Sequence, residues 1–183
     1  MKAGKSSPGP KLVLPIPNRD HIQGTTDAPF VLLEYGDYEC PYCGDAHPVV
    51  KALQRQLGDR LCFAFRNFPL VNAHPHAEHA AEAAEAAGAQ GKFWQMHDML
   101  FENQNALEDE NLAQYAEKLG LDARRLVSEV AASAHLPRVR EDFKNGARDG
   151  VNGTPTFFVN GVRYDDEPGV AELYAVLTKP QPA

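Results

Sequence analysis

The sequence has few cysteines, no block of basic residues and no long apolar segment. It holds 3 cysteines in 183 residues, too few for a disulfide-stapled scaffold, so redox or metal chemistry is the more natural use for them. Its net charge of −7 at pH 7 makes nucleic acid and anionic membrane surfaces unexpected partners. No apolar run approaches the ~18 residues that a membrane-spanning helix needs, and we expect no such span. What is present, 183 residues with 43% hydrophobic content, fits one globular domain or one domain with a sizeable insertion.

The first residues of the chain are rich in Lys, Gly, Ser and Pro. We expect residues 1–11 to form a flexible tail. Because this stretch has no apolar signal-peptide core, the sequence taken literally predicts a cytoplasmic protein. A chain whose signal had been removed would look the same, so a periplasmic or extracellular location is the alternative.

Two of the cysteines, Cys40 and Cys43, stand between a predicted buried strand (residues 30–33) and a predicted helix. Pro41 occupies the first turn of that helix, where proline is tolerated. Cys40 is therefore expected at the helix N-terminus, where free N–H groups and the helix dipole lower a thiol pKa into a range of roughly 3.5 to 7.5. Cys43, one turn on, can form a disulfide with it. The alternative is half of a zinc site, which needs a second pair of ligands.

The apolar periodicity predicts an α/β chain with a long helical block in its middle. Residues 61–68 alternate like a second strand beside the first, with the helix after Cys43 completing a βαβ unit. Strands are predicted again on both sides of Asn160-Gly161, a strong hairpin signal, and a helix closes the chain at 172–179. A short edge strand is expected at residues 11–16 and turns at 20–24 and 27–29.

This order of elements is that of a thioredoxin fold with a helical insertion. We divide it into an N-terminal part of the thioredoxin fold (residues 12–73), an inserted helical subdomain (74–149) and a C-terminal part of the thioredoxin fold (150–183).

Several motifs together resemble one branch of the thioredoxin superfamily. The chain is similar to the DsbA-like thiol–disulfide oxidoreductases, and more narrowly to the bacterial thioredoxin-like proteins related to DsbA and to the domain sometimes attached to sodium/proton antiporters. The similarity spans nearly the whole chain and rests on the order and spacing of the motifs. These are Asp37-Tyr38-Glu39-Cys40-Pro41-Tyr42-Cys43, Phe65-Arg66-Asn67-Phe68-Pro69-Leu70, His74-Pro75-His76-Ala77, Gly91-Lys92-Phe93-Trp94 and Gly153-Thr154-Pro155-Thr156-Phe157.

The resemblance implies roles for residues at both ends of the chain. Cys40 would be the nucleophile and Cys43 the resolving cysteine, with Pro41 and Tyr42 as the supporting residues between them. Thr154-Pro155 would be a cis peptide bond lying against the disulfide, although the residues by themselves favour an ordinary trans turn. Thr154 would then tune the thiolate through its backbone N–H or its hydroxyl.

The resemblance also places an acidic residue beneath the cysteines, which here is Glu34. A carboxylate in an apolar strand is costly, so its pKa should rise and let it take the proton from Cys43. The alternative is that Glu34 faces solvent at a strand end. Glu39 beside Cys40 should disfavour the thiolate, so we expect a less oxidising pair than the family's strongest oxidants.

The remaining candidates for site residues are histidines and the third cysteine. His74, His76 and His79 form the only metal-like cluster, but no nearby Cys or paired acid completes a familiar site, and we assign no metal. His47 is interpreted as a solvent-facing helical residue. Cys62 should be a small buried apolar residue in a strand, with a resolving-thiol role as the alternative.

The predicted function is thiol–disulfide exchange with protein thiols and disulfides through Cys40 and Cys43, without a bound cofactor. Three alternatives remain open: a glutaredoxin-like, glutathione-dependent reductase, suggested by the Cys-Pro-Tyr-Cys tetrapeptide; a non-catalytic redox-sensing or partner-docking module; and a zinc-binding protein. The physiological substrate, the redox partner, the direction of electron flow and the oligomeric state are not determined by the sequence.

Overall fold

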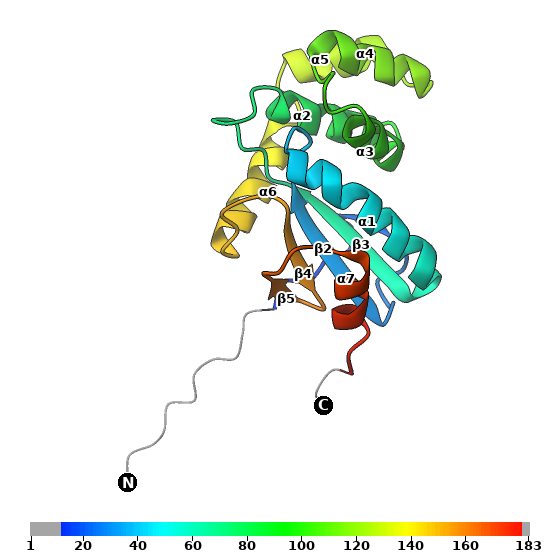
Figure 1. Cartoon of the computed structure of the whole chain (residues 1–183). Coiled ribbons are helices and arrows are strands. Elements are labelled where there is room, and N and C mark those ends of the chain that lie inside the picture. Colours follow the sequence, from blue (N-terminus) through cyan, green and yellow to red (C-terminus); the bar gives the residue numbers. More distant parts are fainter. Residues whose placement is uncertain (1–11, 181–183) are drawn as a thin grey trace.

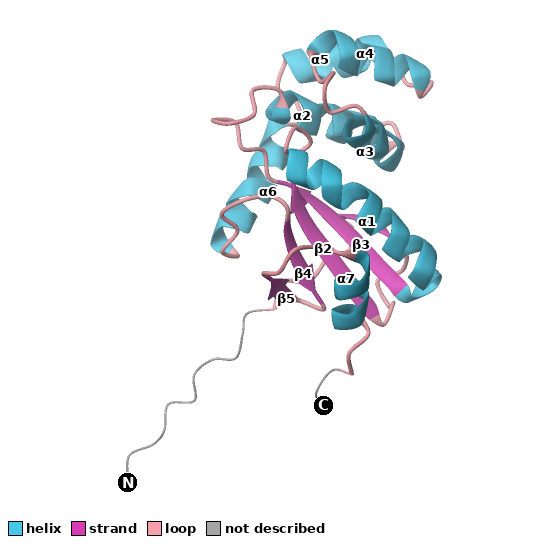
Figure 2. Cartoon of the chain, in the orientation of Figure 1, coloured by secondary structure: helices cyan, strands magenta, loops and turns pink. Residues whose placement is uncertain are grey.

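The computed structural model of the chain describes residues 12–180, so the tail predicted at residues 1–11 lies outside the described residues. Strands and helices alternate at both ends of the chain, and five helices fill its middle (Figures 1 and 2). In chain order the elements are β1 (His21–Gln23), β2 (Phe30–Gly36), α1 (Pro41–Leu57), η1 (Gly58–Arg60), β3 (Leu61–Asn67), α2 (Ala77–Gly88), α3 (Phe93–Glu102), α4 (Asp109–Lys118), α5 (Ala123–Ala131), α6 (Leu136–Arg148), β4 (Thr156–Val159), β5 (Val162–Tyr164) and α7 (Val170–Leu177).

The five strands form one mixed sheet in the order β1-β3-β2-β4-β5. β2 and β3 are parallel, as expected for two strands joined through helix α1, and the other neighbouring pairs are antiparallel. β2 is central, and all of its residues from Leu32 to Gly36 are buried. The segment that follows it, residues 37–40, therefore begins at the carboxyl end of a buried central strand.

Two apolar clusters cover the two faces of the sheet. On one face, α1 and α7 pack against side chains that include Leu32, Phe63 and Phe157, and this cluster continues into the inserted helices (Figure 1). On the other face, a smaller cluster includes Leu33, Tyr35 and Phe158. Helix α6 packs on that second face through Gly146: a Cβ there would lie 2.7 Å from the ring of Phe68, so only glycine allows this close approach.

The fold class predicted from the sequence is confirmed: a thioredoxin fold whose βαβ half and terminal hairpin are separated by helices. The predicted residue boundaries of the parts, at 73/74 and 149/150, stay a prediction. Within residues 12–180, no helix combines the length and the apolar character required to cross a bilayer.

Two local predictions near the N-terminus are wrong. The described part of the predicted edge strand, residues 12–16, forms no strand; Val13 N–H donates one hydrogen bond of 2.8 Å to the carbonyl of Gly161 instead. The edge strand is β1, within the segment predicted as a turn, where Ile22 pairs with Ala64. Pro15 within this segment and Pro17 directly after it have no N–H to donate to a ladder, and β1 is too short to show a period.

Candidate active site

Cys40 lies at the N-terminus of α1, directly after the carboxyl end of the central strand. It is the N-cap residue and Pro41 is the first helical residue, so the proline costs the helix no hydrogen bond. The carbonyl of Cys40 accepts hydrogen bonds of 3.1 Å from the N–H groups of both Cys43 and Gly44, which closes the first turn. Cys40 is 3% exposed and Cys43 is fully buried, and both are free thiols.

The loop before β4 reaches the same point from the other end of the chain. The Thr154-Pro155 peptide bond is cis, and the Sγ of Cys40 lies 3.3 Å from the carbonyl oxygen of Thr154. The sequence predicted that Thr154 tunes the thiolate through its backbone N–H or its hydroxyl, and the carbonyl is a further contact that the sequence did not predict. The two segments are 114 residues apart in sequence, and β2 and β4 bring them together as antiparallel neighbours.

The surroundings of Cys40 lower its thiol pKa to about 5. The largest cause is a hydrogen bond from the Cys43 side chain, and burial opposes it. The Thr154 side chain, whose buried hydroxyl has no other hydrogen-bond partner within residues 12–180, lowers the pKa further, as do the N–H groups of Tyr42 and Cys43. At neutral pH this environment keeps Cys40 as a thiolate, the form that attacks disulfides.

The two groups behind Cys40 are held neutral. Burial, the Cys40 side chain and the nearby Glu34 raise the pKa of Cys43 well above its usual value. Glu34 is 2% exposed in β2, and its Oε1 has no hydrogen-bond partner in the described part of the chain. Burial raises the pKa of this carboxyl to about 8, and the negative charge of Cys40 adds to the effect. Glu34 is therefore enclosed beneath the cysteines and does not face solvent.

Hydrogen bonds that the sequence did not predict hold the turn in place. The carboxylate of Asp37 accepts hydrogen bonds from the N–H groups of Glu39 and Leu70, each 2.8 Å, and pairs with Nδ1 of His74 at 2.7 Å. The amide of Gln104, between α3 and α4, donates to the carbonyls of Tyr38 (2.9 Å) and Cys40 (2.8 Å). No periodicity or motif identifies Gln104, because its role depends on how the inserted helices pack onto α1.

Gly44 is the position that lets Gln104 approach the turn. A Cβ at Gly44 would lie 2.0 Å from Oε1 of Gln104, far inside van der Waals contact. Tyr42, by contrast, points away from this contact and is 73% exposed. Glu39 is also engaged by the insert, since its carboxylate accepts a 2.6 Å hydrogen bond from the N–H of His76.

The histidines are arranged differently from the sequence interpretation. His47 is buried at 8% exposure and its ring stacks on Phe101, so its prediction as a solvent-facing residue is wrong. The packing of α3 against α1 covers it. His74 and His79 bind different carboxylates, those of Asp37 and Asp109.

A different group of possible metal ligands comes together between α1 and α3. One ligand atom from each of His47, His97 and Asp98 lies within 4.8 Å of the others. Lys51 Nζ contacts the same Asp98 carboxylate at 2.8 Å, and Tyr38 OH lies 3.1 Å from Nδ1 of His97. These partners already occupy ligand atoms of His97 and Asp98. Burial lowers the pKa of both histidines, which favours their neutral form. We therefore describe the group as a packed polar cluster of the α1–α3 interface.

Cys62 is remote from the other two cysteines. It is 1% exposed and pairs with Val31 near the start of β2, whereas Cys40 follows the end of that strand. Cys62 and the Cys40–Cys43 pair therefore lie near opposite ends of β2, about a strand length apart.

The family model for thioredoxin matches residues 17–179 of this sequence. The chain belongs to the thioredoxin family. The match covers the strands, the Cys40–Cys43 turn, the inserted helices and the terminal hairpin, so one family description accounts for nearly all of the described residues.

The curated relatives in sequence are longer proteins, and the chain matches one part of each. The chain is 44% identical over 168 residues to the Na(+)/H(+) antiporter NhaA 1 of Salinispora arenicola, covering 91% of this chain and 26% of that protein. It is 45% identical over 172 residues to NhaA 1 of Mycobacterium sp. strain KMS, covering 92% of this chain and 28% of that protein. The chain thus spans about a quarter of the length of these relatives.

Similar solved structures include the thiol-disulfide exchange protein alpha-DsbA2 from Wolbachia pipientis, with a TM-score of 0.76 and 16% identity, covering 88% of this chain and 87% of that chain. BdbD from Bacillus subtilis, in its oxidised form, has a TM-score of 0.82 and 23% identity, covering 92% of this chain and 96% of BdbD. Alpha-DsbA1 from Wolbachia pipientis has a TM-score of 0.77 and 20% identity, covering 91% and 92%. At these identities the comparison establishes the DsbA-like fold, and activity is argued from the site itself.

Proposed function

We propose that this protein is a thiol–disulfide oxidoreductase that exchanges disulfides with protein substrates, with Cys40 as the nucleophile and Cys43 as the resolving thiol. The observation that carries the proposal is the pairing of an ionised, barely exposed Cys40 with a neutral, fully buried Cys43 at one helix tip. The fold neighbours support it because they include proteins described as thiol–disulfide oxidoreductases.

The first step is attack of the Cys40 thiolate on one sulfur of a substrate disulfide. A bond forms between Cys40 and that sulfur, and the second substrate sulfur leaves as a thiolate that takes a proton from water. Cys43 then attacks Cys40, the Cys40–Cys43 disulfide forms, and the first substrate sulfur leaves as a thiol. Two electrons pass from the cysteine pair to the substrate, and the same steps in reverse oxidise a substrate dithiol.

Glu34 supplies the route for the proton of Cys43. While Cys40 is a thiolate, its charge helps keep Glu34 protonated. Formation of the mixed disulfide removes that charge, so the pKa of Glu34 falls and Glu34 can release its proton to water. The resulting carboxylate then accepts the proton of Cys43 as Cys43 attacks Cys40. Thr154-Pro155 presents backbone groups beside Cys40, where an extended substrate segment can lie.

The test is reduction of insulin by dithiothreitol, with turbidity as the readout. The wild-type protein should accelerate precipitation and Cys40→Ser should abolish the acceleration, whereas Cys62→Ser should retain it because Cys62 lies at the far end of the sheet. Acceleration by Cys40→Ser equal to that of the wild type would contradict the proposal.

A further inference from the structure

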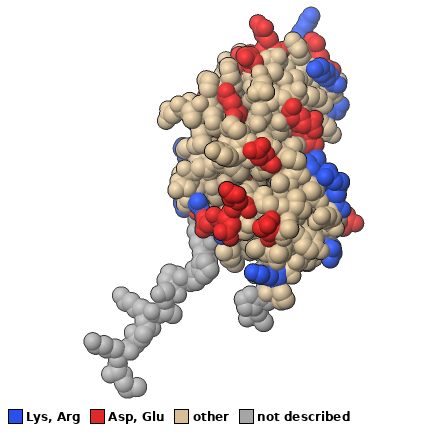
Figure 3. Space-filling view, viewed as in Figure 1, with Lys and Arg blue, Asp and Glu red and all other residues tan. Residues whose placement is uncertain are grey.

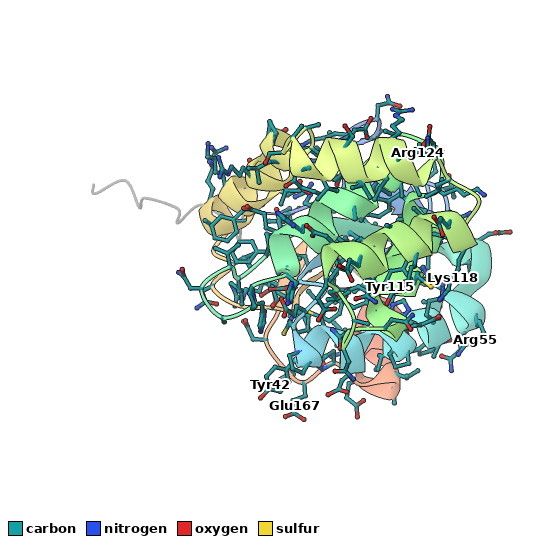
Figure 4. The ribbon with its side chains drawn as sticks, turned by 90° about the horizontal axis from the view of Figure 1, so that it is seen from above. Tyr42, Arg55, Tyr115, Lys118, Arg124 and Glu167 are labelled. Atoms are coloured by element: carbon teal, nitrogen blue, oxygen red, sulfur yellow. The ribbon has the colours of Figure 1, made fainter. Side chains whose placement is uncertain are left out.

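A groove of about 800 Å³ lies beside the Thr154-Pro155 bond. One side is formed by the first two turns of α1, including Tyr42 and Asp45, and the other by residues 165–169 and the start of α7. Figure 4 shows Tyr42 and Glu167 at the same end of the molecule, pointing outward from these two sides. The groove adjoins Cys40, because Thr154 belongs both to its lining and to the contacts of Cys40.

The groove is lined by carboxylates. Of the residues that line it, five are acidic and none is Lys, Arg or His: Asp45, Asp165, Asp166, Glu167 and Glu172. Asp165 pairs with Arg163 at 2.6 Å, but the other four make no ion pair within residues 12–180. Figure 3 shows acidic side chains gathered on this face of the molecule, while most of the Lys and Arg side chains lie toward its margins.

A second, smaller groove of about 380 Å³ lies on the other side of the helix tip. Its lining includes Glu39, Pro41 and Glu108, with His76 as the only residue that can carry a positive charge. Carboxylates therefore line both of the grooves that adjoin the start of α1. In the larger groove, four exposed carboxylates without an ion pair within residues 12–180 lie together and repel one another. Of the four, only Glu172 lies in the first turn of a helix, where the helix dipole favours a carboxylate.

We infer that this acidic groove selects cationic polypeptide segments, so that the preferred substrates carry Lys or Arg residues next to the reacting cysteine. The inference rests on the proposed function and adds the substrate class to it. Charges within about one Debye length, which is about 8 Å at physiological salt, interact measurably. The groove adjoins the reacting sulfur through Thr154. The same field disfavours glutathione, whose net charge is −1, and therefore opposes the glutaredoxin-like alternative.

The test uses three synthetic peptides that differ only in flanking residues: three Lys, three Ser or three Glu around one cysteine carried as a 2-thiopyridyl disulfide. The Cys40 thiolate attacks the peptide sulfur and neutral 2-thiopyridone is released, which is followed by absorbance. At low ionic strength we expect the Lys peptide to react about tenfold faster than the Glu peptide, with the Ser peptide between them, and 0.5 M NaCl to remove most of this ratio.

Two triple variants with the same change in net charge identify the groove as the cause. Asp166→Asn/Glu167→Gln/Glu172→Gln should lower the Lys-to-Glu rate ratio at least threefold. The matched control, Asp59→Asn/Glu110→Gln/Glu117→Gln, removes one exposed Asp and two exposed Glu at the far end of α1 and on α4 and should leave the ratio unchanged.

The possible outcomes separate this inference from the proposed function. Equal rates for all three peptides, or the same loss of ratio in both triple variants, would overturn the acidic-groove inference while leaving the exchange activity in place. A Cys40→Ser protein that reacts with the Ser peptide as fast as the wild type would contradict the proposed function itself.

Discussion

The low pKa of Cys40 predicts an unusual dependence of its reactivity on pH. At pH 5 a thiol with a pKa of about 5 is half ionised, whereas an ordinary cysteine with a pKa of about 8.5 is about 0.03% ionised, a ratio of about 1,600. Nucleophilicity falls with pKa along a slope of about 0.4–0.5, which offsets about 40-fold of this. Cys40 should therefore react about 40-fold faster than a free cysteine at pH 5, and at a similar rate at pH 7.

The assay is the reaction of the reduced protein with 2,2′-dipyridyl disulfide between pH 4 and 9, beside an unstructured cysteine peptide. The protein rate should rise through a midpoint near pH 5 and be nearly flat from pH 6 to 8, while the peptide rate rises tenfold per pH unit over that range. A protein rate that follows the peptide, with its midpoint above pH 8, would refute the account of how the helix tip, Cys43 and Thr154 ionise Cys40.

Two further predictions concern the groups around Cys40. Glu34 has a pKa raised by burial from 4.5 to about 8, so the folded protein binds the extra proton and loses stability as pH rises between these values. In urea titrations, the wild-type free energy of unfolding should fall by about 3 kcal/mol from pH 4.5 to 7 relative to that of Glu34→Gln. If the free energies of the two proteins change in parallel with pH, Glu34 is not buried as a protonated acid. Gln104→Ala removes both hydrogen bonds to the turn and should lower the free energy of unfolding by about 1–3 kcal/mol. The control Gln114→Ala, at an exposed position, should lower it by less than about 0.5 kcal/mol. Equal losses in the two variants would mean that the Gln104 contacts contribute nothing to stability.

Most of the fold could be predicted from the sequence because its signals are local. The apolar run before Gly36, the Asn160-Gly161 turn and the long helical periodicity each reflect contacts between residues close in the chain. β1 could not be found in this way, because three residues show no period and their strand character comes from pairing with β3, 40 or more residues away. The wrong prediction of an edge strand at residues 11–16 has the same cause, because whether a segment pairs with the sheet depends on residues distant in the chain.

The same distinction between local and long-range contacts applies to the residues of the candidate site. Cys40, Cys43 and Pro41 lie within four residues, so their geometry follows from one helix start. The burial of His47 depends on α3, the hydrogen bonds of Gln104 depend on the insert, and the acidic groove combines the start of α1 with residues near the C-terminus. None of these three features leaves a pattern in one stretch of sequence, and each appears only once the inserted helices and α7 are packed onto α1.

The most direct test of the central claim is an equilibrium titration of the protein against reduced and oxidised glutathione, with the disulfide located by mass spectrometry. We predict a single two-electron transition that joins Cys40 to Cys43 and leaves Cys62 free. Because the stabilised thiolate favours the reduced form, the potential should be less negative than the about −270 mV of thioredoxin. If no Cys40–Cys43 disulfide forms at any ratio of the two glutathione forms, the pair does not exchange electrons and the proposed function is wrong.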